Sequence, residues 1–572
     1  MTEHELRETV RSFHQQTSQT LTGLRPYPTE QEVQDAAAVW HERDNIEHTI
    51  RNGNPNPGIP LNNAEREAFL REIDHSFSEK GMWMVISTVS LSAFLQGFVQ
   101  SSNNGANLFA EYWISQTGDN PVNSRFAFTN AAVYFSAAVI GCPLAAPMNS
   151  LFGRRGTIIV ASVLILAASV GSACIELNEN SWAVLGGIRL ISGVGMGLKA
   201  TSTPILAAET AVGSWRGSSV LLWQLCPEKA YASLLRLRNT KMQAVRDLFL
   251  TYKGIEAENT KESLAPVPGG GAHYLLRYWK ILKIRRLRNA LIASGIVALS
   301  QQLSGINLMA FYGGTTLVGI TPGNVPEANQ ISRAMLYNLI FGLLNFLFCL
   351  PAIYYIDVWG RRKILLFTVP FMAICLMGAA VSFERLSREA VAAWLYFHTI
   401  FYSPGMGPVP FILAAESFPL AYRDTGASFA ISINFLFAGL LAWLQPLLVD
   451  GIEFGGTIGV FSGLNVVAFV LIFLLVEETS GVPLESLSLI FNKPKGEFTR
   501  FQIFETLPWL GKLMLGKSSL AEQPVINYDL RGQPSVHESE DEEHLRESND
   551  VSYGMRLADM HGGNVGGQVE RN

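Results

Sequence analysis

The chain has 572 residues, of which 48% are hydrophobic and only 16% are charged. A soluble domain carries about 25% charged residues, so this composition indicates a membrane protein and excludes a disordered, collagen-like or disulfide-stapled chain. The net charge of −5 gives the chain no general basic face, and we therefore expect no nucleic-acid partner.

We expect neither a cofactor nor a metal, and no enzymatic activity. None of the five cysteines forms a C-x-x-C pair, and four of them lie inside long apolar runs, which favours buried thiols over disulfides or metal ligands. The sequence contains no nucleophile constellation. The glycines at 269–271 lack the Lys-Ser/Thr pair that a nucleotide-binding loop requires.

Residues 1–80 are polar and are predicted to form an N-terminal tail, without the apolar segment of a cleavable signal peptide. Ten apolar runs follow, each long enough to cross a hydrocarbon core of roughly 30 Å. Because a backbone in lipid must satisfy its own hydrogen bonds, each run is predicted to be a helix. The alternative is a set of buried helices in a large soluble protein, which ten runs of this length disfavour. The runs lie at about 83–100, 127–148, 157–175, 182–208, 290–311, 336–356, 363–382, 390–414, 425–447 and 457–476.

Basic residues gather in alternate connections between these runs. Arg154 and Arg155 follow the second run, Arg361 and Arg362 follow the sixth, and a basic stretch fills residues 236–288. The positive-inside rule places these connections and both termini in the cytosol. The polar end of the chain, residues 478–572, includes an acidic run and is predicted to be a disordered cytosolic tail, a docking role being the alternative.

The sequence contains an internal repeat of charged motifs. Gly153-Arg154-Arg155 recurs as Gly360-Arg361-Arg362, and the pair Glu209 and Arg216 recurs as Glu416 and Arg423. Each corresponding pair is 207 positions apart (153 and 360, 209 and 416, 216 and 423). Two separate motifs at one offset predict a duplicated helical bundle, the architecture of one large class of transporters.

The repeat is incomplete in the first half. Two apolar runs follow Arg423, whereas Arg216 is followed only by residues 217–226 before the charged sequence Pro227-Glu228-Lys229. Ten residues make about 15 Å of helix, half a membrane. We therefore expect an N-terminal bundle of four spans and a truncated fifth at 81–226, a basic central loop at 227–288 and a six-span bundle at 289–477.

The motifs together resemble those of the sugar porter family of the major facilitator superfamily, and in subtype its fungal hexose and inositol members. The run at 189–197 resembles the fourth-span signature, Gln301-Gln302-x-x-Gly305-x-Asn307 the seventh-span sugar motif, and residues 407–411 the tenth-span signature. Val476-Glu477-Glu478-Thr479 resembles the closing P-E-T sequence, with Glu477 in place of proline. The resemblance covers residues 81 to 491 apart from the gap.

This resemblance implies an all-α polytopic membrane protein with two pseudo-repeated bundles and about ten complete spans instead of twelve. It implies transport of a sugar or polyol of the hexose or inositol class by alternating access, with the solute and the lipid bilayer as partners and proton coupling as a possible addition. We expect the protein in the plasma membrane. The alternative is a sugar-binding sensor that does not transport. A third possibility is a chain with neither activity, because one wall of the cavity is missing.

A site for a sugar needs neutral amides, which donate and accept hydrogen bonds, and an aromatic plate for the ring. Asn307 lies obliquely to Gln301 and Gln302 on a helix, so the helix must either present a broad polar face or be broken. Gly305 and the glycines at 313–314 permit such a break. For a single intramembrane amide the alternative is hydrogen bonding between helices. Phe411 replaces the tryptophan of the family. The resemblance implies substrate contacts from Gln224, Gln301, Gln302, Asn307, Tyr312, Asn345, Phe411 and Asn434.

The repeated charges occur at the cytosolic ends of spans, where carboxylate and guanidinium groups could pair and hold an inner gate shut. The alternative is that the arginines only fix orientation in the membrane. Ser150 occupies the position of the family's first-loop aspartate, so we expect a weakened first-half network. The predicted gating residues are Arg154, Arg155, Glu209, Arg216, Asp357, Arg361, Arg362, Glu416 and Arg423.

Proton coupling by the family's first-span aspartate is not expected, because the matching stretch Gly97-Phe98-Val99 ends in a residue that cannot titrate. Facilitated diffusion is the simpler expectation. Lys199 lies within the fourth run, where an ionisable residue is a functional candidate unless it pairs or reaches the interface.

Overall fold

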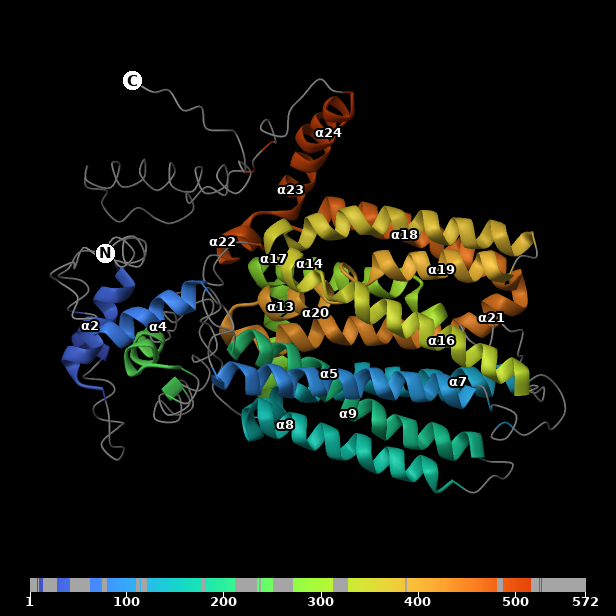
Figure 1. Cartoon of the computed structure of the whole chain (residues 1–572), viewed down its shortest axis with the longest axis horizontal. Coiled ribbons are helices and arrows are strands. Elements are labelled where there is room, and N and C mark those ends of the chain that lie inside the picture. Colours follow the sequence, from blue (N-terminus) through green and yellow to red (C-terminus); the bar gives the residue numbers. More distant parts are fainter. Residues whose placement is uncertain are drawn as a thin grey trace, which may run out of the picture. The chain divides into compact units, whose positions relative to one another are not determined.

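The computed structural model describes residues 8, 10–13, 28–41, 62–74, 80–107, 109, 114, 121–175, 181–210, 234–235, 238–249, 271–311, 328–385, 388–480, 487–515, 524 and 526. In these ranges every regular element is a helix (Figure 1). Residues 1–524 form one compact unit, and the description below concerns that unit.

The first four predicted runs form the helices of the N-terminal half. They are α5 (Lys80–Asn107), α7 (Pro121–Ser136), which continues through the π-helical turn η1 (Ala137–Gly141) into α8 (Cys142–Ala173), and α9 (Ser181–Thr210). The continuous helix from α7 to α8 holds two runs, and it is interrupted at Gly153. Helix α9 packs against α5, α7 and α8.

The other six predicted runs form the helices of the C-terminal half, preceded by α13 (Gly271–Lys283). Figure 1 shows these helices packed side by side. The last two runs share one helix, which is interrupted at Glu453. The helices are α14 (Arg285–Leu303), a helical stretch at 306–311, α16 (Ala328–Cys349), α17 (Ala352–Trp359), α18 (Arg361–Glu384), α19 (Arg388–Tyr402), α20 (Val409–Glu416) and α21 (Leu420–Leu475).

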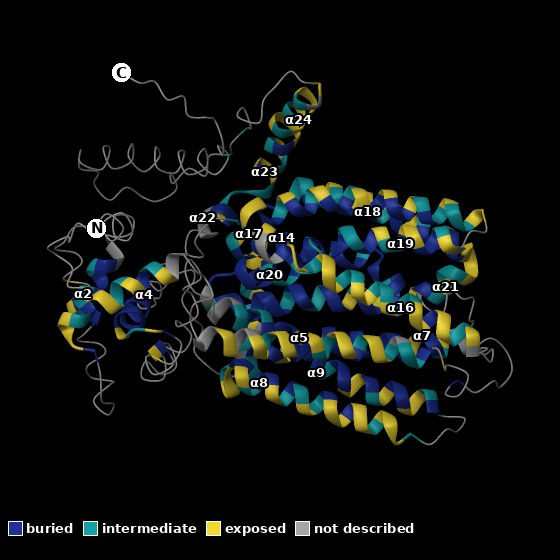
Figure 2. Ribbon diagram, viewed as in Figure 1, coloured by how far each residue is buried: buried dark blue, intermediate teal, exposed yellow. Residues whose placement is uncertain are grey.

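The ten apolar runs are helical, although turns divide three of them, 290–311, 336–356 and 390–414, into two helices each. By length and composition alone, five described helices could cross a membrane, and two of these, 50 and 55 residues long, each contain two runs. Large apolar side chains face outward on α8 at Val163, Leu166 and Val170, one helical turn apart, as a lipid-facing stripe requires (Figure 2).

The internal repeat is visible in the backbone. Gly153 and Gly360, 207 positions apart, adopt nearly the same conformation, with φ of 71° and 97° and ψ of 168° and 153°. A positive φ with an extended ψ is strained for a residue with a Cβ, and glycine avoids that strain; among the described residues Glu453, at φ 59° and ψ 172°, is the one non-glycine residue with a positive φ. The repeated Gly-Arg-Arg motif therefore forms the same kind of turn in both halves.

Replacing Gly360 by alanine is expected to destabilise the C-terminal half. Besides the backbone strain of about 1–3 kcal/mol, the new Cβ would lie 2.5 Å from a carboxylate oxygen of Glu478. The midpoint of thermal unfolding in detergent should fall by several degrees. Gly342→Ala is the matched control, since its Cβ would meet open space on α16. Equal midpoints for the two variants would contradict this reading.

The prediction of a disordered tail from 478 onwards is wrong for residues 487–515, which are helical. These residues form α22 (Leu487–Asn492), α23 (Lys495–Phe501), the π-helical turn η4 (Gln502–Thr506) and α24 (Leu507–Met514). Phe491 and Phe498 are buried, and Lys495 Nζ donates to Glu477 Oε1 at 2.6 Å and to the Leu475 carbonyl at 2.9 Å. The buried Glu477, which replaces the family's proline, thus has a counter-ion on the segment that follows.

The polar N-terminal segment contains α2 (Glu30–His41) and α4 (Asn63–Asp74). Both begin with a capping box: Thr29 and Glu32 bond each other's backbone N–H groups, and so do Asn62 and Glu65. Such T-x-x-E and N-x-x-E spacings supply partners for N–H groups that a helix start leaves unpaired.

Candidate functional site

Helix α14 ends at Leu303, and Ser304 and Gly305 break it from the helical stretch at 306–311, which is one of the two arrangements that the sequence left open. Gly305 has a φ of 81°. The Ser304 carbonyl is bonded from two other helices: Asn465 Nδ2 donates to it at 3.1 Å, and His398 Nε2 lies 2.9 Å from it. Both side chains are buried. They fix the break, after which the chain resumes a helix at residue 306.

The break brings four amide side chains into one hydrogen-bonded group. Gln302 Nε2 donates to Asn434 Oδ1 at 2.9 Å, and Asn434 Nδ2 donates to Gln301 Oε1 at 2.7 Å. Asn307 Nδ2 donates to Gln302 Oε1 across the break. We call Gln301, Gln302, Asn307 and Asn434 the amide network.

Backbone carbonyls fix the orientation of the network. Gln301 Nε2 donates to the carbonyl of Met406 at 2.7 Å and to that of Gly407 at 3.2 Å, in the turn before α20. Asn434 Nδ2 also donates to the Ala298 carbonyl at 2.9 Å. Because amides both donate and accept, the network can exchange its internal hydrogen bonds for those of a polyhydroxylated solute.

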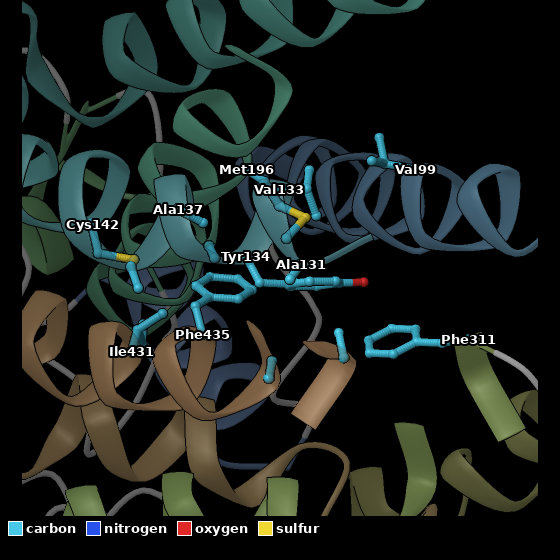
Figure 3. Close-up of a cluster of buried hydrophobic side chains, with 14 of the residues drawn as sticks. Val99, Ala131, Val133, Tyr134, Ala137, Cys142, Met196, Phe311, Ile431 and Phe435 are labelled. Atoms are coloured by element: carbon cyan, nitrogen blue, oxygen red, sulfur yellow. The ribbon is translucent and has the colours of Figure 1, made fainter. Parts of the chain in front are cut away.

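Aromatic side chains join the two halves beside the network. The ring of Tyr134, on α7, lies 4.9 Å from that of Phe311 and 6.4 Å from that of Phe435, centroid to centroid (Figure 3). All three belong to one buried cluster that draws residues from both halves, and Phe411 packs against it. Phe311 lies one helical turn after Asn307, and Phe435 directly follows Asn434, so the cluster places aromatic side chains close in sequence to the amides.

Asn107 is a polar residue that the sequence analysis did not assign to the site. It is buried at the end of α5, and its Nδ2 donates to the Phe311 carbonyl at 3.3 Å. Among the described residues its Oδ1 has no hydrogen-bond partner. A buried acceptor without a donor is costly unless a ligand or water supplies one. A polar residue at the end of an apolar run was the signal available in the sequence.

Of the other predicted contact residues, two are described by the structure and two are not. Asn345 lies outside the amide network, and its Oδ1 accepts from Ser403 Oγ at 2.8 Å. Phe411 is half-buried on α20. Gln224 and Tyr312 lie outside the described residues.

The repeated charges form different contacts in the two halves. In the second half, Arg361 pairs with Glu416 at 3.2 Å, and both are buried. In the first half, the equivalent Arg154 reaches across to Asp424, with its Nη2 2.9 Å from each carboxylate oxygen. Asn149 Nδ2 adds a bond of 3.2 Å to Asp424 Oδ1.

Asp424 thus joins the two halves, and the sequence analysis missed it. Asn149 is itself held by Ser202 Oγ, which donates to Asn149 Oδ1 at 2.8 Å. The residue at the family's aspartate position, Ser150, instead bonds the hydroxyl of Tyr274 on α13. The only signal for Asp424 was its place directly after the repeated Arg423.

A second carboxylate caps the start of α18. Glu478 accepts hydrogen bonds from the backbone N–H groups of Arg361 at 2.9 Å and Arg362 at 3.1 Å, and from Lys363 at 3.3 Å. Arg362 Nη2 donates to Gln502 Oε1 and to the Phe473 carbonyl, both at 2.9 Å. Negative charge at a helix N-terminus is favourable, so this cap fixes the second Gly-Arg-Arg turn.

The remaining predicted gating residues are less defined. Arg155 is exposed, and Arg423 is buried with its Nε and Nη1 unpartnered among the described residues. The side chains of Glu209 and Asp357, and all of Arg216, lie outside the described residues.

Two residues bear on ion coupling. Val99 is buried in the apolar cluster around Tyr134, so the first span presents no titratable group at this position. Lys199 is fully buried in α9, and its Nζ has no partner among the described residues.

The described part of the chain holds no group of three or more His, Cys, Asp or Glu side chains that could bind a metal.

Comparison with known proteins adds to this geometry. The chain matches the family described as "Sugar (and other) transporter" over residues 85–228 and 227–491. The chain belongs to this family. The two matched segments meet at residues 227–228, the position at which the sequence analysis places the missing spans. Membership of a transporter family accords with the expectation that the chain is not an enzyme.

Two of the relatives that this chain resembles carry names of polyol or inositol transporters. "Probable polyol transporter 3" of Arabidopsis thaliana is 24% identical over 71% of this chain and 91% of its own length. "Myo-inositol transporter 1" of Cryptococcus neoformans is 23% identical over 77% and 89%.

Among solved structures, the proton:xylose symporter XylE of the major facilitator superfamily matches with a TM-score of 0.52 and 20% identity over 71% of this chain and 99% of its own. The all-α polytopic fold predicted from the sequence is therefore confirmed. These similarities favour the transporter over the sensor alternative.

Proposed function

We propose that the chain carries a sugar or polyol of the hexose or inositol class across the membrane by alternating access. The observation that carries this proposal is the amide network, which lies in the C-terminal half beside a cluster shared by both halves. Its four amides match the donors and acceptors of solute hydroxyls, and the rings of Tyr134, Phe311 and Phe435 offer an apolar surface.

We assign the inner gate to the ion pairs at the repeated motifs. Arg154 with Asp424 would close the contact between the two halves, while Arg361 with Glu416 would hold the C-terminal half together. Alternating access requires only that the first pair break and re-form. Both termini and residues 227–288 would then lie in the cytosol, and the plasma membrane is the proposed location.

Transport is proposed to be facilitated diffusion. XylE is a proton symporter, but its similarity to this chain supports the fold alone. Here Val99 occupies the first-span position that would have to carry a proton, and it lies among apolar side chains. Uptake should therefore depend little on a proton gradient, and collapsing that gradient with an uncoupler measures this.

The deciding experiment is uptake of radiolabelled myo-inositol, glucose and xylose into cells that lack their own transporters. Saturable uptake of one of these solutes supports the proposal. Binding of the solute to purified protein without uptake would favour the sensor, and neither binding nor uptake would indicate an inactive chain. The transcript around Gln224–Pro227 should be sequenced alongside, because an omitted exon would explain the two missing spans.

Asn107→Leu is expected to raise the KM for the transported solute about tenfold. The leucine removes the acceptor Oδ1 and the bond to the Phe311 carbonyl, and one buried hydrogen bond contributes about 1–1.5 kcal/mol. Initial uptake rates over a range of solute concentrations measure the change. An unchanged KM would exclude Asn107 from the site, and the exposed Asn329 on α16 gives the matched control Asn329→Leu.

A further inference from the structure

The polar N-terminal segment and the central loop share one apolar core. Side chains from the first 74 residues pack with side chains from residues 234–249, more than 150 positions later in the chain. The rings of Phe13 and Phe249 meet edge to face with centroids 5.9 Å apart. The buried members are Val10, Phe13, Val33, Ala36, Ala37, Val39, Phe69, Leu234, Met242, Ala244, Val245, Leu248 and Phe249.

A buried group of charged side chains in the central loop contacts α4. Asp247 is almost fully buried and pairs with Arg238 at 2.6 Å and with Arg246 at 3.0 Å. The guanidinium of Arg246 lies 5.1 Å from the ring centre of Phe69 on α4. Arg238 and Arg246 pair with the buried carboxylate within residues 238–247, and the contact of Arg246 with Phe69 joins this segment to α4.

Two further contacts cross between the segments. Gln243, which is fully buried, donates from Nε2 to the Ala68 carbonyl at 3.5 Å. Lys241 Nζ donates to Glu32 Oε1 of α2 at 2.6 Å, at the edge of the core. The core, the buried charges and these bonds together make a small folded domain from two regions that the sequence presents as tail and loop.

This domain is tied closely to the first span. Only residues 75–79 separate the end of α4 from the start of α5, a stretch that reaches about 20 Å when fully extended. Helix α5 itself is thinly packed: of its described side chains only Ser92, Val99 and Asn107 are fully buried, and most of the others are exposed (Figure 2).

We propose that the described residues between 8 and 74 and between 234 and 249 form a clasp that ties the start of α5 to the central loop and so retains α5 in the N-terminal half. Helix α5 is the first span of that half, and the central loop is the chain that leaves it after α9. The clasp would therefore close a bundle for which the sequence predicts a truncated fifth span and no sixth. This inference does not depend on the identity of the transported solute or on transport itself.

The test uses the full-length chain in membranes, with an epitope tag at the N-terminus and a specific protease site inserted between residues 52 and 53. After cleavage, the piece ending at residue 52 carries six of the core residues and no predicted span. The clasp should keep this piece with the pelleted membranes. Ala37→Asp, which places a carboxylate in the core, should release most of it, whereas Ala64→Asp, at an exposed position on α4, should not.

Release of the piece from the unsubstituted chain would overturn the proposal, and so would retention of the piece in Ala37→Asp. The second half of the proposal has its own measurement, thermal unfolding of the uncleaved protein in detergent. Ala37→Asp should lower the midpoint by several degrees and Ala64→Asp should leave it unchanged. If Ala37→Asp releases the piece without lowering the midpoint, the clasp does not retain α5. Uptake enters neither measurement, so failure here leaves the transport proposal standing.

Discussion

Asn434→Ala is expected to lower kcat/KM for solute uptake by about 100-fold. The side chain of Asn434 holds Gln301 and Gln302 together and also bonds the Ala298 carbonyl. Its removal leaves these buried groups unpaired, and loss of the two bonds to Gln301 and Gln302 alone, at about 1–1.5 kcal/mol each, corresponds to roughly that factor. The measurement is the initial rate of uptake as a function of solute concentration, normalised to protein in the membrane.

The matched control for this variant is Asn329→Ala, which truncates an exposed asparagine on α16. Its uptake should equal that of the unsubstituted chain. A loss in Asn434→Ala that disappears after normalisation to folded protein would mean that the network only holds the helices together. Uptake with unchanged kcat/KM would remove the amide network from the transport site.

Asp424→Ala is expected to shift the chain toward its cytosol-open state and to slow uptake by about tenfold or more. Arg154 and Asp424 are largely buried, with side chains 8% and 13% exposed, so loss of one partner leaves a desolvated charge. Breaking a buried pair costs about 3–5 kcal/mol, and the remaining exposure here reduces that figure. The closed state loses this stabilising free energy, whereas the open state loses nothing because the pair is already broken in it.

Opening can be followed with a cysteine in place of Thr425, which is buried next to Asp424, after the five native cysteines are replaced. An impermeant thiol reagent applied from the cytosolic side should label this cysteine faster in Asp424→Ala. The double variant Arg154→Asp with Asp424→Arg should recover slow labelling and part of the uptake. Glu67→Ala breaks the exposed pair with Arg71 and should change neither. Equal labelling rates would show that the pair is not a gate.

The sequence predicted the features that depend on local pattern. Ten apolar runs became helices because length and composition suffice for a chain in lipid. The break at Gly305 is one of the two arrangements that the sequence left open there, and the repeated Gly-Arg-Arg motif marked the positions of the turns at Gly153 and Gly360 without predicting their conformation. The grouping of Gln301, Gln302, Asn307 and Asn434 followed from motif resemblance, and the structure supplies the bonds.

Features that depend on contacts distant in sequence were missed. Asp424 accepts a hydrogen bond from Arg154, 270 positions away, and neither the residue types nor their spacing predicts that pair. The core between the N-terminal segment and residues 234–249 uses scattered alanines, valines and phenylalanines inside polar sequence, so it leaves no apolar run. The helices at 487–515 were predicted to be tail for the same reason. Lys495 and Phe498 lie in polar sequence, and their packing depends on contacts with Glu477 and the end of α21 that the sequence does not show.

The amide network consists of four side chains that carry no charge, and Val99 adds none. A sugar or polyol bound there would also be neutral, so each crossing would move no net charge and the membrane voltage would do no work on it. Flux would then follow the solute gradient alone and reverse when that gradient reverses. A cell using such a carrier could release the solute through it as readily as take it up.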